Sequence, residues 1–239
     1  MKDIFLILGG NGFVGNGVMK AMSEEKFKIR CIDMVLPKEN EIIPGVEYIV
    51  GDIYDEAFFI NALDNVDTVL NFISTTMPNS GEISLEKEIY STLKMQNYIL
   101  KKMADAGVSR YVFPSSGGAI YGDKDNETAH EDDKLFPKTP YGVGKKMCED
   151  IISYYSEKCG ISAYIFRIGN VYGSTNYRKK AQGVIDVFIQ NALLNEEICI
   201  WGNAEKSVRD YVYMEDVSNA ICQALKVKRE GINIYNIGT

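Results

Sequence analysis

The sequence predicts a doubly wound α/β fold, in which helices cover both faces of a parallel sheet. Strand-like runs of Val, Ile, Leu and Phe alternate with helical segments, and many of these runs are apolar throughout. Continuous apolar strands are buried on both faces, as in a parallel sheet between two helical layers. The 239 residues, 46% of them hydrophobic, are enough for one large domain with a sizeable core.

The first four strands are expected within the first 73 residues. The run DIFLIL predicts a strand at 3–8, and a glycine-rich turn leads from it into a helix through about Glu24. Apolar and β-branched residues predict the elements that follow. They are strands FKIRCID at 27–33, VEYIV at 46–50 and DTVLNFI at 67–73, with DEAFFINAL at 55–63 as a short helix.

Longer helices separate the remaining strands. One helical pattern covers 82–106 and stops at Gly107, and another covers 141–158. The expected strands are RYVFPSS at 110–116, SAYIFRI at 162–168 and INIYNIGT at 232–239.

The regular alternation loosens after about Gly173. We therefore expect a main domain over 1–173, with its last sheet elements returning at about 205–239. Residues 174–204 are expected to begin a smaller lobe that is interleaved with these elements.

Composition narrows the classes of function. The net charge of −7, without a long basic run, disfavours nucleic acids and anionic membranes as partners. No apolar run reaches membrane-spanning length. His130 is the only histidine, so no metal is expected. The five cysteines form no C-x-x-C pair, which favours a reducing, cytoplasmic location over a disulfide framework.

The segment LGGNGFVG follows the first strand and opens the first helix. Gly9, Gly12 and Gly15 permit a tight turn and close approach of a pyrophosphate, which the free N–H groups of a helix N-terminus then bind. Asp33 ends the second strand, where a carboxylate accepts both ribose hydroxyls of adenosine and repels a 2′-phosphate. The pattern predicts a Rossmann-type site for NAD rather than NADP. The alternative is a structural turn and a surface aspartate.

The segment GDIYD follows the third strand and allows two interpretations. Asp52 and Ile53 are expected to flank an adenine, or the segment only caps the next helix through Asp55.

Tyr141 and Lys145 are four residues apart at the start of a predicted helix, so they share one face. A free phenol has a pKa of about 10, and a nearby ammonium favours its phenolate form. The pair is therefore suited to exchanging a proton with a sugar or steroid hydroxyl. An exposed tyrosine and a solvated lysine would be the alternative in a sequence without the glycine loop.

Several further motifs occur in order along nearly the whole chain. They are SSGGAIYG at 115–122, RIGNVYG at 167–173, SVRDYVYMEDV at 207–217 and YNIGT at 235–239. Together with the glycine loop, Asp33, GDIYD and the Tyr141–Lys145 pair, they resemble the extended short-chain dehydrogenase/reductases. Within that family the chain is most similar to the NAD-dependent epimerase/dehydratase branch and its nucleotide-sugar 4-epimerases, such as the UDP-galactose 4-epimerases.

The resemblance implies roles for individual residues. Phe13 and Val14 would lie by the cofactor pyrophosphate. Asn170 and Arg209 would bind a nucleotide-diphosphate sugar, with Arg209 on the diphosphate, because a guanidinium pairs with two phosphate oxygens at once. An ion pair of Arg209 with Asp210 or Asp216 is the alternative. The implied NAD-binding residues are Gly9, Gly12, Phe13, Val14, Gly15, Asp33, Asp52, Ile53, Phe72, Ile73, Ser74, Tyr141 and Lys145.

The chain departs from the family pattern in three places. Ser91 stands near the position of a common asparagine, and Thr76 where some epimerases have a cofactor-binding lysine. The sequence given stops at YNIGT, where relatives usually continue and complete the sugar-binding lobe. We therefore expect 1–173 to be the NAD-binding domain and 174–204 part of an incomplete substrate lobe.

The expected reaction is NAD-dependent 4-epimerisation of a nucleotide sugar through a 4-keto intermediate. Related 4,6-dehydratases carry an Asp-Glu pair where this chain has Gly117, Gly118 and Ala119, which disfavours dehydration. The alternatives are an NAD(P)-dependent 4-keto-sugar reductase and an inactive dinucleotide-binding relative. The family also implies a homodimer through the helices at 82–106 and 141–158.

The segment PSSGGAIYG contains two candidate catalytic serines. Counting from the strand places Ser116 where relatives have the hydroxyl that bonds the sugar O4, with one added residue in the glycine turn. Counting back from Tyr121 places Gly117 there instead. A strand inside a sheet has a fixed register whereas a turn accepts insertions, so Ser116 is the expected catalytic and substrate-binding serine. Ser115 is expected to be structural or to face the cofactor.

Overall fold

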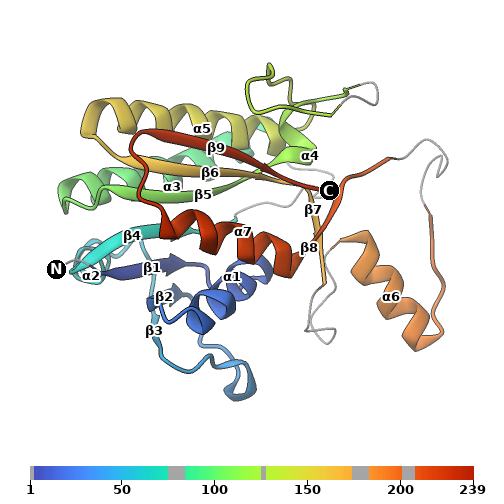
Figure 1. Cartoon of the computed structure of the whole chain (residues 1–239), viewed down its shortest axis with the longest axis horizontal. Helices are drawn as coiled ribbons and strands as arrows, with labels where there is room; N and C mark the ends of the chain where they lie inside the picture. The colour runs from blue at the N-terminus through green and yellow to red at the C-terminus, as the bar shows by residue number, and fades with distance from the viewer. Residues whose placement is uncertain (1–2, 75–83, 125–127, 174–182, 201–207) are drawn as a thin grey trace.

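The computed structural model describes residues 3–74, 84–124, 128–173, 183–200 and 208–239. Within them, seven parallel strands form one sheet in the order β3-β2-β1-β4-β5-β6-β9, with helices on both faces (Figure 1). This confirms the doubly wound α/β fold. The strands are β1 Ile4–Leu8, β2 Lys28–Asp33, β3 Val46–Val50, β4 Val66–Asn71, β5 Arg110–Ser116, β6 Ser162–Ile168 and β9 Ile232–Ile237.

The helices divide between the two faces of the sheet. One layer contains α1, Phe13–Glu24, and α7, Met214–Lys226, which pack against each other (Figure 1). The other contains α2, Glu56–Ala62, α3, Leu85–Asp105, and α5, Pro140–Cys159. Among the described residues, no helix is both long and apolar enough to cross a membrane.

Each layer of helices encloses its own half of the hydrophobic core, and the sheet separates the two halves. Tyr111 and Phe113 of β5 point toward α3 and α5, whereas Val112 between them points toward α1 and α7. This alternation follows from the pleat of the strand, which turns successive side chains to opposite faces. Strand residues are therefore apolar in succession, as the sequence predicted.

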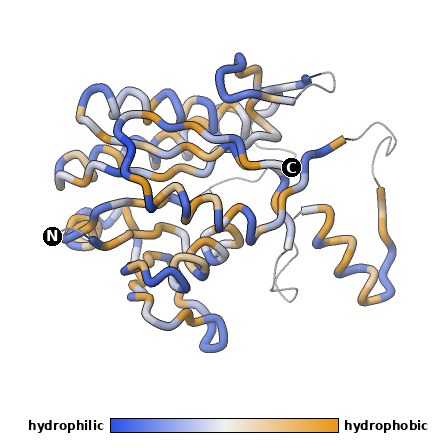
Figure 2. The backbone as a smooth tube through the Cα atoms, viewed as in Figure 1, coloured by the Kyte–Doolittle hydropathy of each residue, from blue (hydrophilic) through white to orange (hydrophobic). Residues whose placement is uncertain are grey.

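The remaining elements are short or lie at one end of the molecule. A 3-10 helix, η1, covers Glu39–Glu41, and α4 covers Gly117–Ile120. Strands β7, Asn170–Tyr172, and β8, Tyr211–Tyr213, form a separate parallel pair. Helix α6, Val184–Leu194, lies away from the sheet, and its tube in Figure 2 is largely hydrophobic.

The carboxyl ends of the strands meet at one edge of the sheet. Strand β1 pairs with β2 on one side and with β4 on the other, so the order of the strands reverses at β1. Ligands of open α/β sheets bind in the crevice at such a point. The turns after β1, β2, β4 and β5 all open there, and they contain most of the predicted site residues.

Candidate active site

The glycine loop, residues 9–15, closes tightly on its surroundings. Gly9 has φ +74°, and a Cβ there would lie 3.0 Å from the backbone nitrogen of Ile73. A Cβ on Gly15 would lie 2.6 Å from the Gly9 carbonyl oxygen. The loop can therefore reach both the first turn of α1 and the segment after β4 only because these two positions lack side chains.

The N-terminus of α1 is suited to an anion. Its N-cap, Gly12, provides no side-chain hydrogen bond, and the first turn contains no acidic residue. The first N–H groups of the helix lack intrahelical acceptors and, together with the helix dipole, attract phosphate. Phe13 and Val14 form this turn and pack in part against the α1–α7 core. These observations fit the pyrophosphate of a dinucleotide.

Asp33 lies beside the glycine loop at the end of β2. Its Oδ2 accepts a hydrogen bond from the backbone nitrogen of Asn11 at 3.0 Å, and its Oδ1 accepts one from Met34 at 2.8 Å. The Asn11 side chain donates to the Val35 carbonyl at 2.5 Å. Sequence reasoning missed Asn11, although its position inside the loop could have suggested a contact. The carboxylate is thus held beside the glycine loop, and its contact with a ribose stays a prediction.

The two aspartates of GDIYD have different local roles. Asp55 is the N-cap of α2 and accepts from Phe58 N at 3.1 Å, as the capping interpretation expected. Asp52 is exposed and accepts from Tyr54 N at 2.9 Å, whereas Ile53 is buried in the core. Contact of Asp52 and Ile53 with an adenine stays a prediction.

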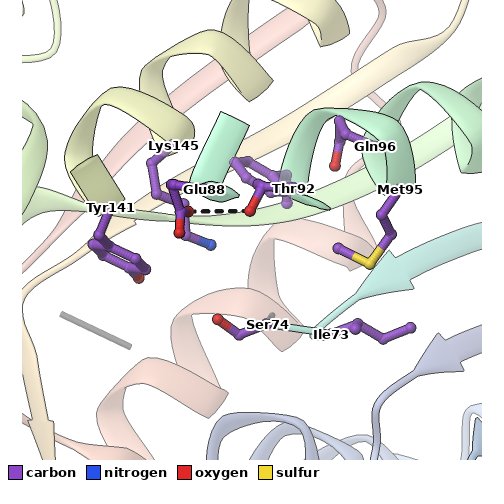
Figure 3. Close-up of a pocket in the computed structure, with 9 residues that line it drawn as sticks. Ile73, Ser74, Glu88, Thr92, Met95, Gln96, Tyr141 and Lys145 are labelled. Atoms are coloured by element: carbon purple, nitrogen blue, oxygen red, sulfur yellow. Dashed lines mark hydrogen bonds between the residues drawn. The ribbon is translucent and has the colours of Figure 1, made fainter. Parts of the chain in front are cut away.

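A pocket at the carboxyl edge contains several predicted residues (Figure 3). The segment after β4 contributes Ile73 and Ser74, and Ile73 N donates to Asn71 Oδ1 at 3.1 Å. Phe72 leaves the strand just before them and packs toward the α1–α7 side. The lining residues are Ile73, Ser74, Glu88, Thr92, Met95, Gln96, Phe113, Tyr141 and Lys145.

Tyr141 and Lys145 both reach this pocket from the first turns of α5. Thr139 caps the helix by accepting from Gly142 N at 3.1 Å, and Pro140 occupies its first position, where proline is favourable. Lys145 Nζ donates to the Pro114 carbonyl at 2.7 Å and lies 5.6 Å from the centre of the Tyr141 ring. The structure therefore brings the predicted pair together.

The two serines of PSSGGAIYG point to opposite faces of β5. Ser116 is the last residue of the strand and is half-buried, and its register opposite Ile168 continues the ladder without a break. Ser115 is buried, and its Oγ has no hydrogen-bond partner among the described residues. Neither lines the pocket of Figure 3, so the assignment of Ser116 as the catalytic serine stays a prediction.

The glycines that follow Ser116 begin the short helix α4, Gly117–Ile120, at the place where the sequence predicted a turn. A Cβ on Gly117 would lie 3.2 Å from the Arg167 carbonyl oxygen, and one on Gly118 would lie 3.6 Å from Asn170 Nδ2. The lack of a side chain at Gly117 lets this turn pack closely against the end of β6, whereas the distance at Gly118 is an ordinary contact. Asn170 is thereby brought beside the serine segment.

The two predicted substrate residues lie at neighbouring strands: Asn170 begins β7, and Arg209 lies just before β8, which pairs with β7. Asn170 donates to the Asp210 carbonyl through its backbone nitrogen at 2.8 Å and through Nδ2 at 3.0 Å. Arg209 is exposed and donates to the Val208 carbonyl at 2.8 Å. In the described part of the chain, Arg209 forms no ion pair with Asp210 or Asp216. Thr76 lies outside the described residues, and Ser91 Oγ donates to the Lys87 carbonyl at 2.8 Å within α3.

A buried polar network is centred on Arg167 of β6, which also pairs with Glu149 of α5. Arg167 Nη1 donates to Tyr121 OH at 2.8 Å and to the Glu131 carbonyl at 2.7 Å. Tyr121 OH donates in turn to Asn236 Oδ1 at 2.6 Å. Asn236 N donates to the Glu131 carboxylate, and this hydrogen bond lowers the pKa of Glu131. Sequence reasoning placed Tyr121, Arg167 and Asn236 in separate motifs but did not predict that they contact one another, and it gave Glu131 no role.

Comparison with known proteins agrees with this geometry. The model of the NAD-dependent epimerase/dehydratase family matches residues 5–238. The chain belongs to this family. Because the family is NAD-dependent, the comparison confirms the cofactor predicted from the glycine loop and Asp33.

Three members of the epimerase/dehydratase family illustrate its range. A protein of Methanocaldococcus jannaschii, provisionally named UDP-glucose 4-epimerase, is 32% identical over 247 residues, which cover 99% of this chain and 77% of the relative. The dTDP-4-dehydro-6-deoxyglucose reductase of Escherichia coli is 28% identical over 246 residues, covering 100% and 77%. The crystal structure of Thermus thermophilus UDP-glucose 4-epimerase in complex with NAD aligns with a TM-score of 0.82 and 28% identity, covering 99% and 78%.

The family therefore includes enzymes that epimerise nucleotide sugars and enzymes that reduce their keto forms. As a member of this family, the chain is an enzyme. The relatives described above are named for reactions of nucleotide sugars. Among the described residues, no cluster of three or more His, Cys, Asp or Glu is arranged to hold a metal.

Proposed function

We propose that the protein is an NAD-dependent nucleotide-sugar 4-epimerase. The observation that carries this proposal is the placement of Tyr141 and Lys145 in one pocket at the carboxyl edge, next to the glycine loop and Ile73. A proton-exchanging pair beside a dinucleotide site is the minimum that reversible oxidation of an alcohol requires.

The residues of the glycine loop and Asp33 would hold the cofactor. The N–H groups at the start of α1 would bind the pyrophosphate, and the fixed Asp33 carboxylate would accept the ribose hydroxyls. When bound, NAD supplies a reversible acceptor for the hydride of sugar C4, so that oxidation to a 4-keto sugar and hydride return to the other face invert that carbon.

Tyr141 then takes the proton of the C4 hydroxyl and later returns it to O4. The Lys145 ammonium, held by the Pro114 carbonyl, stabilises the phenolate that the first step requires. Ser116 would donate a hydrogen bond to O4 from the end of β5. Asn170 and the exposed Arg209 would bind the substrate, with the Arg209 guanidinium on the diphosphate.

The glycine turn favours epimerisation over dehydration. Removal of the C6 hydroxyl needs an acid and a base near C5 and C6, and Gly117, Gly118 and Ala119 of α4 provide no such groups. A 4-keto-sugar reductase is the second candidate, because the E. coli relative carries that name. Asp33 argues against it, since a carboxylate there repels the 2′-phosphate of NADPH.

Two further properties belong to the same proposal. Exposed side chains on α3 and α5, including Leu85, Tyr90 and Tyr154, suit a homodimer formed through these helices. All five cysteines are free thiols, which suits a reducing cytoplasm.

The experiment that tests the function is a panel of UDP-, dTDP- and GDP-hexoses followed by NMR. Inversion at C4 without net consumption of cofactor is the expected result. If a 4-keto sugar causes net oxidation of NADH or NADPH and no hexose is inverted, the protein is a 4-keto-sugar reductase and the epimerase proposal is wrong. Absence of turnover with every substrate would favour the inactive dinucleotide-binding relative.

A further inference from the structure

Glu88 is a buried carboxylate in the pocket that contains Tyr141 and Lys145 (Figure 3). It projects from α3, which packs against α5, and only 1% of the residue is exposed. Its Oε1 accepts a hydrogen bond from Thr92 Oγ1 at 3.0 Å. Sequence analysis did not single it out, because one glutamate in a charged helix carries no signal of burial.

The helix that carries the Tyr141–Lys145 pair has a gap that fits this carboxylate. A Cβ at Gly144 would lie 2.7 Å from Glu88 Oε1. An alanine at this position would collide with the carboxylate or displace it. Gly144 directly precedes Lys145, so the Glu88 side chain lies against the backbone of the same helical turn.

The carboxyl group of Glu88 is only partly satisfied by hydrogen bonds. In the described part of the chain, its Oε2 is buried without a hydrogen-bond partner, and no direct ion pair joins it to Lys145. Of the residues lining the pocket, Lys145 is the only cation and Glu88 the only carboxylate. The other titratable groups nearby are Tyr141 and Cys148 of α5, and Glu149 lies next along that helix. Polar neighbours are Ser74 after β4, Thr92 of α3, and Gln96, which joins Tyr111 of β5.

We infer that Glu88 is a positioning residue that acts by its charge on the Tyr141–Lys145 pair and sets the pH at which Tyr141 accepts a proton. A buried negative charge opposes the formation of a phenolate nearby and favours the ammonium of Lys145. Removal of that charge should therefore make a phenolate easier to form in this pocket. This role rests on the proposed function, since it takes Tyr141 as the proton acceptor.

The test compares Glu88→Gln with the wild-type protein across pH. Glutamine keeps the acceptor for Thr92 and removes the charge. The acid limb of the kcat/KM profile for 4-epimerisation is expected to move to lower pH by about half a unit to one unit. The matched control is Glu86→Gln, an exposed glutamate on the same helix, which should leave the profile unchanged. Coincident profiles for Glu88→Gln and wild type would overturn the inference.

A conservative variant separates charge from packing. Glu88→Asp keeps the charge and shortens the side chain, so its acid limb should stay within about 0.3 units of wild type. An equal shift in Glu88→Asp and Glu88→Gln would assign the effect to packing and overturn the inference.

A second readout does not need turnover. The near-ultraviolet absorbance of tyrosinate, titrated in the wild-type protein and in Tyr141→Phe, gives the ionisation of Tyr141 as the difference between them. The same difference in a Glu88→Gln background should have its midpoint at lower pH, and an unchanged midpoint would refute the role of Glu88. If no nucleotide sugar is turned over, the proposed function fails while this titration still decides the role of Glu88.

Discussion

Arg167 and Glu149 form an ion pair that is buried between β6 and α5, one turn beyond Lys145. Arg167 Nη2 lies 2.8 Å from Glu149 Oε2, and Arg167 Nε donates to Oε1 at 3.2 Å. Their side chains are 4% and 7% exposed. The pair joins α5 to β6 of the sheet. It thereby helps to hold the helix that carries Tyr141 and Lys145 in place.

We expect loss of this pair to be costly. Glu149→Ala leaves the Arg167 guanidinium buried and without its carboxylate, so the free energy of unfolding should fall by about 3–5 kcal/mol. The exposed pair of Lys146 and Asp150 on the same helix is the control, and Asp150→Ala should cost at most about 1 kcal/mol. Urea unfolding measures both, and equal losses would contradict a special role for the buried pair.

Purified protein should carry NAD(H), identified by mass after extraction. The Asp33 carboxylate should favour NAD because it accepts ribose hydroxyls and repels a 2′-phosphate. Asp33→Asn should weaken NAD binding by roughly 10-fold or more, as for a lost charged hydrogen bond, and reduce the preference over NADP. Calorimetric titration with each dinucleotide checks this. A wild-type protein that carries mainly NADP(H) would refute the argument from Asp33.

Tyr141→Phe should keep the fold and the bound cofactor but lower turnover by about 100-fold or more, as for loss of a general base. Lys145→Met should cause similar damage and require a higher pH for its remaining activity, because the ammonium that favours phenolate is gone. Tyr154→Phe, an exposed tyrosine on the same helix, is the control. A Tyr141→Phe enzyme within about twofold of wild type would rule out the mechanism.

The two serines at the end of β5 should differ in effect. Ser116→Ala should lower turnover about 10- to 1000-fold, in the range for a lost transition-state donor. Ser115→Ala should cost much less, because its buried hydroxyl points to the opposite face of the strand. Steady-state kinetics with the preferred sugar compares them. A larger loss of turnover in Ser115→Ala than in Ser116→Ala would mean that the register argument is wrong. If neither substitution lowers turnover, the segment serves only as a turn.

The fold was largely predictable because its strands are apolar on both faces. The fifth and sixth strands match their expected bounds, 110–116 and 162–168. The fourth ends at Asn71 rather than at residue 73: Phe72 N still donates to the Leu8 carbonyl at 2.9 Å, and Ile73 and Ser74 then leave the sheet to line the pocket. The apolar pattern continues past the hydrogen-bonded ladder there, so composition alone could not locate the end.

The parts of the site that are formed by residues at a fixed spacing in the sequence could be predicted. The parts that depend on contacts between distant segments were harder to predict. The glycine loop and the Tyr141–Lys145 pair are local patterns, and the structure shows them as such. Glu88 became visible only in three dimensions, since Gly144, against which its carboxylate lies, belongs to another helix. A single sequence shows which side chains are available but does not reveal pairings between distant segments.

The hydrogen bond from Tyr121 to Asn236 joins two residues that are 115 positions apart in the chain. Such a contact closes a long loop, and the entropy lost in closing long loops slows folding. Strand β9 pairs with β6 and carries Asn236, and it follows the other described strands in order of synthesis. The polar network centred on Arg167 is therefore completed only when β9 has emerged from the ribosome, so a nascent chain that already contains Tyr141 and Lys145 still lacks part of the framework that holds them.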